Sequence, residues 1–237
     1  LGPASPPVPV PKAAAELAVE LGAKVALVDV NGDTLGAVAD ALGDNAKAYV
    51  GSVAEPGFVQ GMVADVVRDF GAVHGLMNNA GIVRAAMIHK MPVETWQQVI
   101  DVNLTGVFLC LQEVGRHYME RAKDGDEAPG AIVNVSSIAG RRGTIGQINY
   151  GAAKSGVLGI TMSAAREWGR HGIRVNSVCF GLVETPMTET VRGEKFRDQY
   201  MAMIPMGRFS APEEVAKPVC FLLSEGASYV TGQHLNI

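Results

Sequence analysis

Short runs of hydrophobic residues alternate along the chain with longer stretches in which hydrophobic residues recur every three or four positions. The short runs, rich in Val and Ile, predict buried strands at 24–30, 46–50, 75–77, 132–137, 173–180 and 231–237. The periodic stretches predict helices at 12–21, 32–42, 56–70, 93–121 and 212–224, and a further helix that contains Tyr150 and ends near 170. This alternation is typical of a parallel α/β sheet, and 237 residues suit a single domain with a sizeable core.

The first eleven residues break the alternation, because five of them are proline. Proline has no backbone N–H to donate, so this segment cannot form a paired central strand. It predicts an extended, polyproline-like arm at 1–11. The first strand of the alternating pattern is therefore expected to be atypical or missing.

The stretch from Ile132 to Lys154 carries the strongest candidate chemistry. A predicted strand ends in Ser136 and Ser137, and a loop of Gly, Arg and Thr leads into the helix with Tyr150 and Lys154. Four residues apart on a helix, these two side chains lie on one face, so the lysine ammonium can sit beside the phenol. A nearby cation favours the phenolate, so we expect it to lower the pKa of the tyrosine. The group predicts proton transfer at a carbonyl or alcohol oxygen.

Charge and composition favour small-molecule chemistry. The net charge is −4 and 19% of the residues are charged, without a basic run, which disfavours nucleic acid and anionic membranes as partners. No hydrophobic stretch is long enough to span a bilayer and no leader pattern is visible, so we expect a cytoplasmic protein. Cys110, Cys179 and Cys220 lie in apolar runs without metal or disulfide spacing, and the five histidines are dispersed, so no metal site is predicted.

Three motifs, in order along the chain, carry a resemblance to a known family. They are N-N-A-G at 78–81, D-V-N-L-T-G-V-F at 101–108 and Q-I-N-Y-G-A-A-K at 147–154. The chain resembles the short-chain dehydrogenase/reductase family, and within it the 3-oxoacyl-(acyl carrier protein) reductase-like members. The resemblance covers about Ala13 to Ile237 and implies a Rossmann-type, doubly wound parallel sheet in three layers.

The resemblance implies a catalytic set of four residues. Tyr150 would donate a proton to the carbonyl oxygen, and Ser137 would be the second donor to that oxygen. Lys154 would lower the pKa of Tyr150 and hold the nicotinamide ribose. Asn103, an amide in the middle of a predicted helix, would open that helix locally and hold a water that links the lysine to solvent.

Asp29 bears on the choice of cofactor. It lies at the end of a predicted strand, where a dinucleotide-binding βαβ unit places an acid that accepts hydrogen bonds from the adenosine ribose. The same carboxylate would repel a 2′-phosphate, so we expect NAD in preference to NADP. The other cofactor contacts that the resemblance implies are Ser52, Val53, Asn79, Ala80, Gly81, Tyr150, Lys154, Gly181, Val183 and Thr185.

The chain departs from the family in front of its first helix. The family's T-G-x-x-x-G-x-G motif brings glycine backbone to the cofactor pyrophosphate at the helix N-terminus, and its glycine positions fall here on Ser5, Pro9 and Pro11. Either the N-terminus has been altered, or the protein binds the dinucleotide weakly or not at all.

These observations predict an NAD(P)-dependent oxidoreductase that interconverts a ketone and a secondary alcohol, with 3-oxoacyl thioesters as the leading substrates. Two alternatives stay open: an NAD-dependent dehydrogenase of a sugar, steroid or xenobiotic alcohol, which Asp29 favours, and a cofactor-free homologue that acts as an interaction subunit. Residues 186–209 contain four methionines and are predicted to form a substrate lid. Small residues in the Tyr150 helix, together with the helix pairing of the family, predict a homodimer or homotetramer.

Overall fold

The computed structural model describes residues 9–237, apart from the side chain of Lys195. Its strands are β1 (Val25–Asp29), β2 (Ala46–Val50), β3 (Gly75–Asn78), β4 (Ala131–Ser137), β5 (Arg174–Phe180) and β6 (His234–Asn236). Its longer helices are α1 (Val10–Glu20), α2 (Gly32–Leu42), α3 (Pro56–Phe70), α4 (Val93–Ile100), α5 (Gly106–Lys123), α7 (Ile148–Trp168) and α10 (Pro212–Leu223). Its shorter helices are α6 (Ala139–Arg142), α8 (Glu189–Arg192) and α9 (Glu194–Met201).

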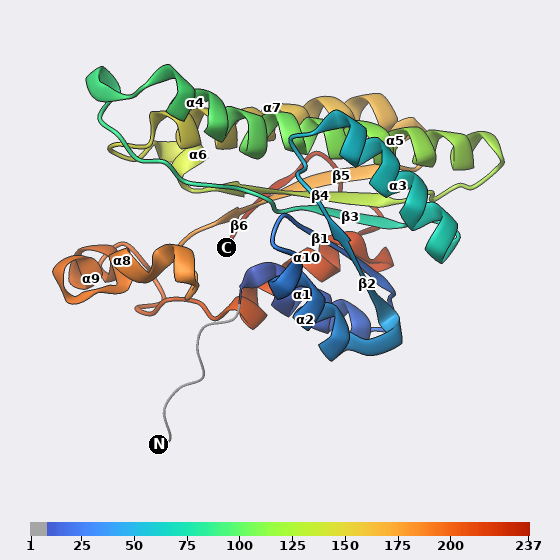
Figure 1. Cartoon of the computed structure of the whole chain (residues 1–237), viewed down its shortest axis with the longest axis horizontal. Helices are drawn as coiled ribbons and strands as arrows, with labels where there is room; N and C mark the ends of the chain where they lie inside the picture. The colour runs from blue at the N-terminus through green and yellow to red at the C-terminus, as the bar shows by residue number, and fades with distance from the viewer. Residues whose placement is uncertain (1–8) are drawn as a thin grey trace.

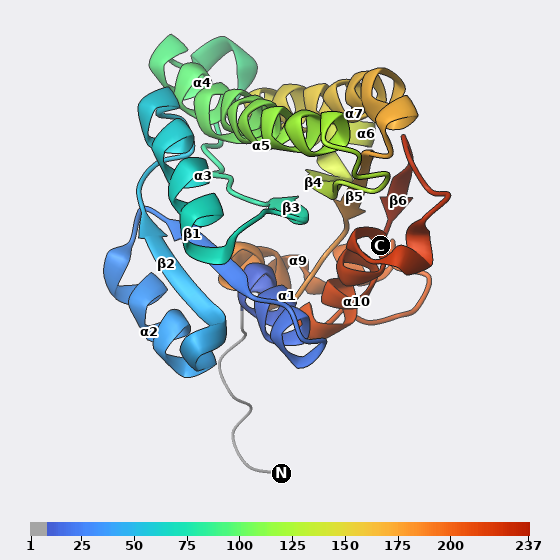
Figure 2. The same ribbon diagram turned by 90° about the vertical axis from the view of Figure 1, so that its right-hand side faces the viewer.

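The strands are parallel throughout the described residues, and helices cover both faces of them. α3, α5 and α7 lie on one face, and α1, α2 and α10 lie on the other (Figures 1 and 2). β4 has β3 and β5 as neighbours, and six of its seven residues are buried. A hydrophobic strand without alternation is expected where both faces are covered. The predicted three-layer α/β fold is confirmed.

The strands form two separate sheets. One contains β1 and β2, and the other has the order β3-β4-β5-β6. The doubly wound order places a first strand between the strands that correspond to β1 and β3, and within residues 9–237 no strand occupies that position. α1 contacts β1 on one side, and its residues Val10 and Ala13 belong to clusters that include Met77 of β3. Within residues 9–237, the two sheets are therefore connected by the side-chain packing of α1.

Proline chemistry explains where α1 begins. The helix starts at Val10, with Pro11 in its first turn, whereas the sequence predicted an extended arm up to that proline. The prediction was wrong for these two residues, because the first turn of a helix does not use the N–H that proline lacks. Pro9, at the start of the helix, is extended as predicted, and residues 1–8 of the predicted arm lie outside the described residues.

The predicted helix at 93–121 is not continuous. A π-helical turn at Asp101–Thr105 separates α4 from α5, which continues to Lys123. A single π-helical turn widens a helix locally and is frequent at functional sites. Two smaller differences concern the Tyr150 helix, which ends at Trp168, and the loop after β4, which contains the short helix α6.

Two hydrophobic clusters pack against the four-stranded sheet from opposite faces. Strand residues Val133, Val135 and Val178 contact α10, while Ile132 and Val175 contact α5 and α7. The three cysteines are free thiols; Cys110 and Cys179 are buried and Cys220 is half-buried. None of the described helices combines the length and the hydrophobicity needed to cross a membrane.

Candidate active site

The carboxyl ends of β4 and β5 meet at one edge of the four-stranded sheet because the strands are parallel. Ser137 ends β4, and Gly181 follows β5 directly. Two backbone hydrogen bonds fix this edge: the N–H of Ile138 donates to the carbonyl of Phe180 at 3.1 Å, and the N–H of Gly181 donates to the carbonyl of Ile237 at 2.8 Å. The loops at this edge are thus anchored to the sheet, which suits a site that must hold side chains in place.

Tyr150 and Lys154 lie one above the other on α7, as their spacing predicts. The Lys154 Nζ is 5.7 Å from the centroid of the Tyr150 ring. Only 2% of the lysine is exposed, and its ammonium donates a hydrogen bond to the Val135 carbonyl of β4 at 2.8 Å. Burial lowers the pKa of Lys154 to about 8. The site therefore contains a buried lysine held between β4 and α7.

The pKa of Tyr150 differs from the sequence expectation. Burial raises it above the ordinary value, and a hydrogen bond with the Ser137 side chain offsets part of that rise. We expected Lys154 to lower this pKa, and that expectation is corrected: removing the phenolate from water has the larger effect, and the lysine directs a hydrogen bond to the Val135 carbonyl. Tyr150 is therefore a protonated phenol at neutral pH.

The two neighbouring serines have different roles. Ser137 is half-buried, bonds to the Tyr150 side chain and accepts the N–H of Ala139 at 3.1 Å. Ser136 is buried and donates to the backbone carbonyl of Lys154 at 2.7 Å, so it joins β4 to α7. The structure thus brings Ser137, Tyr150 and Lys154 together.

Asn103 lies in the π-helical turn and is fully buried. Its Oδ1 accepts the N–H of Ile82 at 2.8 Å, and its Nδ2 donates to the Ile82 carbonyl at 3.0 Å. The expected local opening of the helix is confirmed. The Asn103 amide thus holds the loop that follows β3 against α4 and α5. Gly81 of that loop lies next to the amide, and a Cβ on this glycine would lie 3.4 Å from Asn103 Nδ2.

Asn149 supports the site and was not singled out from the sequence. It is fully buried, donates to the carbonyls of Arg84 at 3.0 Å and Thr95 at 3.4 Å, and accepts the N–H of Tyr150 at 2.8 Å. These bonds fix the first turn of α7 next to the phenol. An amide just before Tyr150, where a helix begins, was the signal that the sequence offered.

Gly140 allows α6 to approach α7 at Lys154. A Cβ on Gly140 would lie 2.6 Å from the carbonyl carbon of Lys154. We expect Gly140→Ala to lower the free energy of unfolding by about 1–3 kcal/mol, measured by urea titration, because the two backbones must separate. The control is Gly61→Ala in α3, where a Cβ meets nothing within 4 Å and stability should be equal or slightly higher. Equal stabilities of the Gly140 variant and the unsubstituted protein would contradict this account.

The predicted adenosine-side residues lie on different elements. Asp29, at the carboxyl end of β1, is exposed and accepts the N–H of Asn31 at 2.8 Å. Ser52 Oγ accepts the N–H of Ala54 at 3.2 Å. Val53 packs closely against Gly106, since a Cβ on that glycine would lie 2.8 Å from the Val53 Cγ2. Asn79, Ala80 and Gly81 follow β3 in the other sheet.

The loop after β5 carries the remaining predicted cofactor residues. Val183 is 4% exposed, because its side chain packs with Val10 of α1 and Val215 of α10. The N–H of Thr185 donates to Thr188 Oγ1 at 3.2 Å. This loop therefore presents backbone, and not the Val183 side chain, towards the edge of the sheet.

A nicotinamide cofactor fits one end of this edge better than the other. At the end where the resemblance implies the nicotinamide, Lys154 is fixed beside Tyr150 by its hydrogen bond to the Val135 carbonyl of β4. At the start of α1, Pro11 has no N–H, and the N–H groups of Lys12 and Ala13 both donate to the Pro9 carbonyl, at 3.0 and 3.2 Å. The first turn of α1 offers few donors to a pyrophosphate.

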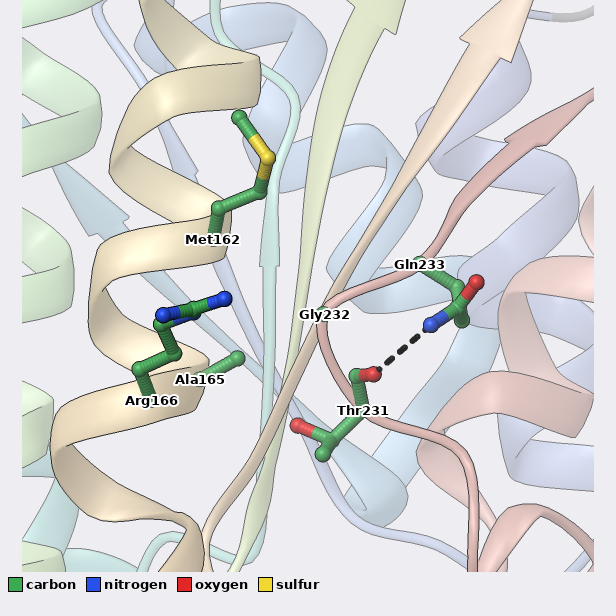
Figure 3. A pocket seen from close by; sticks show the side chains of 6 residues that line it. All are labelled: Met162, Ala165, Arg166, Thr231, Gly232 and Gln233. Atoms are coloured by element: carbon green, nitrogen blue, oxygen red, sulfur yellow. Dashed lines mark hydrogen bonds between the residues drawn. The ribbon is translucent and has the colours of Figure 1, made fainter.

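The cavity shown in Figure 3 lies elsewhere. It measures about 300 Å³ and opens between α7 and the segment before β6. Its lining residues are Met162, Ala165, Arg166, Thr231, Gly232 and Gln233. Two of them are hydrogen-bonded to each other, since the Gln233 side chain donates to the Thr231 carbonyl at 3.1 Å. None of them is a predicted site residue. Within residues 9–237, no group of three or more His, Cys, Asp or Glu side chains could hold a metal ion.

Comparison with known proteins decides the family. A family model described as enoyl-(acyl carrier protein) reductase matches residues 10–237. The chain belongs to the short-chain dehydrogenase/reductase family. Among its relatives, the 3-oxoacyl-[acyl-carrier-protein] reductase of Thermotoga maritima is 43% identical over 95% of this chain and 90% of the relative, and that of Vibrio cholerae is 39% identical over the same shares. The crystal structure of levodione reductase covers 96% of this chain and 91% of its own, with a TM-score of 0.89 and 32% identity.

Membership of the short-chain dehydrogenase/reductase family gives the site its chemistry. The chain is an oxidoreductase that acts on CH–OH groups, and the family works with a nicotinamide cofactor. The predicted family, the predicted ketone–alcohol chemistry and the predicted fold are thus confirmed, and the geometry described above can be read as that of a ketoreductase.

Proposed function

We propose that this protein reduces the 3-oxo group of an acyl thioester to a secondary alcohol, with NADH as the reductant. The relatives at 39% and 43% identity support the acyl-thioester substrate, since they are named for it. The observation that carries the proposal is the protonated Tyr150, bonded to Ser137 and standing over a buried lysine.

The proposed mechanism follows from these side chains. When bound, the reduced nicotinamide supplies the hydride. The Tyr150 hydroxyl donates its proton to the carbonyl oxygen as that oxygen gains charge, and the Ser137 hydroxyl donates a second hydrogen bond to the same atom. The ammonium of Lys154, 5.7 Å from the ring centroid, stabilises the phenolate that is left. Asn103 would anchor a water through which the phenolate recovers its proton.

The raised pKa of Tyr150 suits its proposed role as a proton donor. A phenol whose pKa lies above its ordinary value is protonated through neutral pH, which is the form that a proton donor needs.

The substrate proposal is tested with acetoacetyl thioester and NADH, following the loss of reduced nicotinamide. We expect turnover with the 3-oxo thioester and none with the matched 2-enoyl thioester, because the enoyl compound has no 3-oxo group whose carbon could take the hydride while its oxygen takes the proton. Reduction of the enoyl compound alone would contradict the proposal.

A second candidate is a dehydrogenase of a non-acyl ketone or alcohol. The likeness to levodione reductase, and Asp29 at the end of β1, favour it. The same assay with cyclic diketones and secondary alcohols separates the two, since the better substrate class has the higher kcat/KM.

Asp29 is proposed to select NAD over NADP. Its exposed carboxylate would repel a 2′-phosphate. We expect Asp29→Asn to improve the affinity for NADPH relative to NADH by about tenfold, equivalent to about 1.4 kcal/mol, in fluorescence titrations of both cofactors. Asp44→Asn, at the amino end of β2, is the control and should leave the ratio unchanged. An unchanged ratio in the Asp29 variant would remove this residue from cofactor selection.

Residues 186–209 are proposed to act as a lid. They contain α8 and α9, which project from the body in Figure 1, and three of their methionines, Met187, Met203 and Met206, are more than half exposed. Exposed thioethers suit a surface that closes over an apolar acyl chain.

We further propose a cytoplasmic homodimer or homotetramer. Its contact surface would include Phe108 of α5 and Met162 of α7, which are 43% and 47% exposed. Gly156, one of the small residues of the Tyr150 helix, packs against Leu104 of the same chain.

A further inference from the structure

The first turn of α1 is poor in donors for a phosphate group. A helix N-terminus binds phosphate through its free backbone N–H groups. Pro9 and Pro11 have none, and those of Lys12 and Ala13 point to the Pro9 carbonyl. Val10 supplies the one remaining backbone N–H of this turn. The adjacent side chains do not replace the missing donors, since Val10 and Ala13 are buried.

The one cation in this turn is directed elsewhere. Lys12 Nζ lies 3.7 Å from Glu16 Oε1, one turn further along the helix. This ion pair is partly exposed, with 35% of the lysine side chain and 40% of the glutamate side chain accessible, so it contributes little to stability. It nevertheless neutralises the charge that could otherwise attract a pyrophosphate to the start of α1.

The residues predicted to contact the adenosine half of the cofactor are divided between the two sheets. Asp29 belongs to the β1–β2 sheet, whereas the segment after β3 belongs to the four-stranded sheet, and no ladder joins the two within the described residues. The nicotinamide end has no such division. Tyr150 bonds to Ser137 at the end of β4, Lys154 bonds to the Val135 carbonyl of β4, and the N–H of Gly181 donates to the carbonyl of Ile237, the residue after β6.

We infer that the nicotinamide mononucleotide half of the cofactor carries most of the binding, and that the adenosine half adds little. The inference rests on the proposed function, because it assumes that the Tyr150 site takes a reduced nicotinamide. On this inference Asp29 gives little attraction to NADH. The ligand class that the site accepts therefore includes reduced nicotinamide mononucleotide by itself.

The test compares three ligands on the full chain: NADH, reduced nicotinamide mononucleotide, and ADP-ribose, which has the pyrophosphate and adenosine without the nicotinamide. Nicotinamide fluorescence and calorimetry give the dissociation constants. We expect the first two to differ by less than about tenfold, and ADP-ribose to displace neither at about a hundred times the dissociation constant of NADH. NADH binding more than about a hundredfold tighter than the mononucleotide, or displacement by ADP-ribose, would overturn the inference.

A variant tests the assigned cause. Pro9→Gly/Pro11→Gly restores two backbone N–H groups at the start of α1, and we expect it to gain measurable affinity for ADP-ribose. No gain, in a variant whose circular dichroism and melting temperature match those of the unsubstituted protein, would overturn the role of the two prolines.

The outcomes separate this inference from the proposed function. Tight, adenosine-dependent NADH binding with carbonyl reduction overturns the inference and leaves the function standing. Binding of neither reduced nicotinamide ligand, with no reduction of any ketone, overturns both, and it favours the cofactor-free interaction subunit.

Discussion

Replacing Tyr150 with Phe is expected to lower kcat for carbonyl reduction by about 10²–10⁴-fold, the range that a positioned general acid contributes. The substitution removes one hydroxyl and keeps the ring next to Lys154. Ser137 can still donate a hydrogen bond to the substrate oxygen, but the hydroxyl that transfers the proton to this oxygen is gone. KM should change little, because the proton moves only as the transition state forms.

The stability of this variant separates a catalytic role from a structural one. Because the pKa of Tyr150 is raised, the phenol is neutral at pH 7 and no charge is lost on substitution. The melting temperature of Tyr150→Phe should therefore stay close to that of the unsubstituted protein. Tyr229→Phe, at a fully exposed position, is the matched control and should change neither rate nor stability. Rates near those of the unsubstituted enzyme in Tyr150→Phe would remove this residue from the mechanism.

Replacing Lys154 with Met is expected to have the second large effect. The variant keeps a side chain of similar length and removes the buried charge beside the phenol. We expect kcat to fall by about 10²–10³-fold, as when one preorganised electrostatic contact to developing charge is removed. Lys123→Met, at the exposed end of α5, serves as the control and should keep full activity.

The same variant should change how stability depends on pH. The pKa of Lys154 is about 8 in the folded protein and about 10.4 in an unfolded chain, so between these values the unfolded state binds more protons. The free energy of unfolding should therefore rise with pH from about 8 to about 10.4, by about 3 kcal/mol in total from this group. Urea titrations across this range measure the slope. Lys154→Met should lack this contribution, whereas Lys123→Met should keep it; parallel curves for the two variants would contradict the buried, charged lysine.

The sequence predicted the fold and the proximity of Ser137, Tyr150 and Lys154 where local patterns were sufficient. Helical periodicity placed Tyr150 and Lys154 on one face of a helix, and the change from a strand to a loop placed Ser137 in front of them. Both inferences depend on spacing within a single segment, which is a property that a sequence shows directly.

Other features depended on contacts between segments. Gly140 gave no sign that α6 would approach the backbone at Lys154, and Asn149 gave no sign that its amide would reach the carbonyls of Arg84 and Thr95. The direction of the Tyr150 pKa shift was also missed. A pair of residues suggests a charge effect, whereas desolvation depends on everything packed around the phenol.

Within the described residues, the break between β1 and β3 also bears on pairing with strands of other molecules. Over this part of the chain the two sheets have four edge strands, where one continuous sheet would have two, and each edge has backbone N–H and C=O groups that can pair with a strand from another molecule. Proteins commonly block such pairing by covering an edge with a helix or loop. Since α1 lies across the break and contacts both sheets, we expect this helix to limit strand pairing at the edges of β1 and β3.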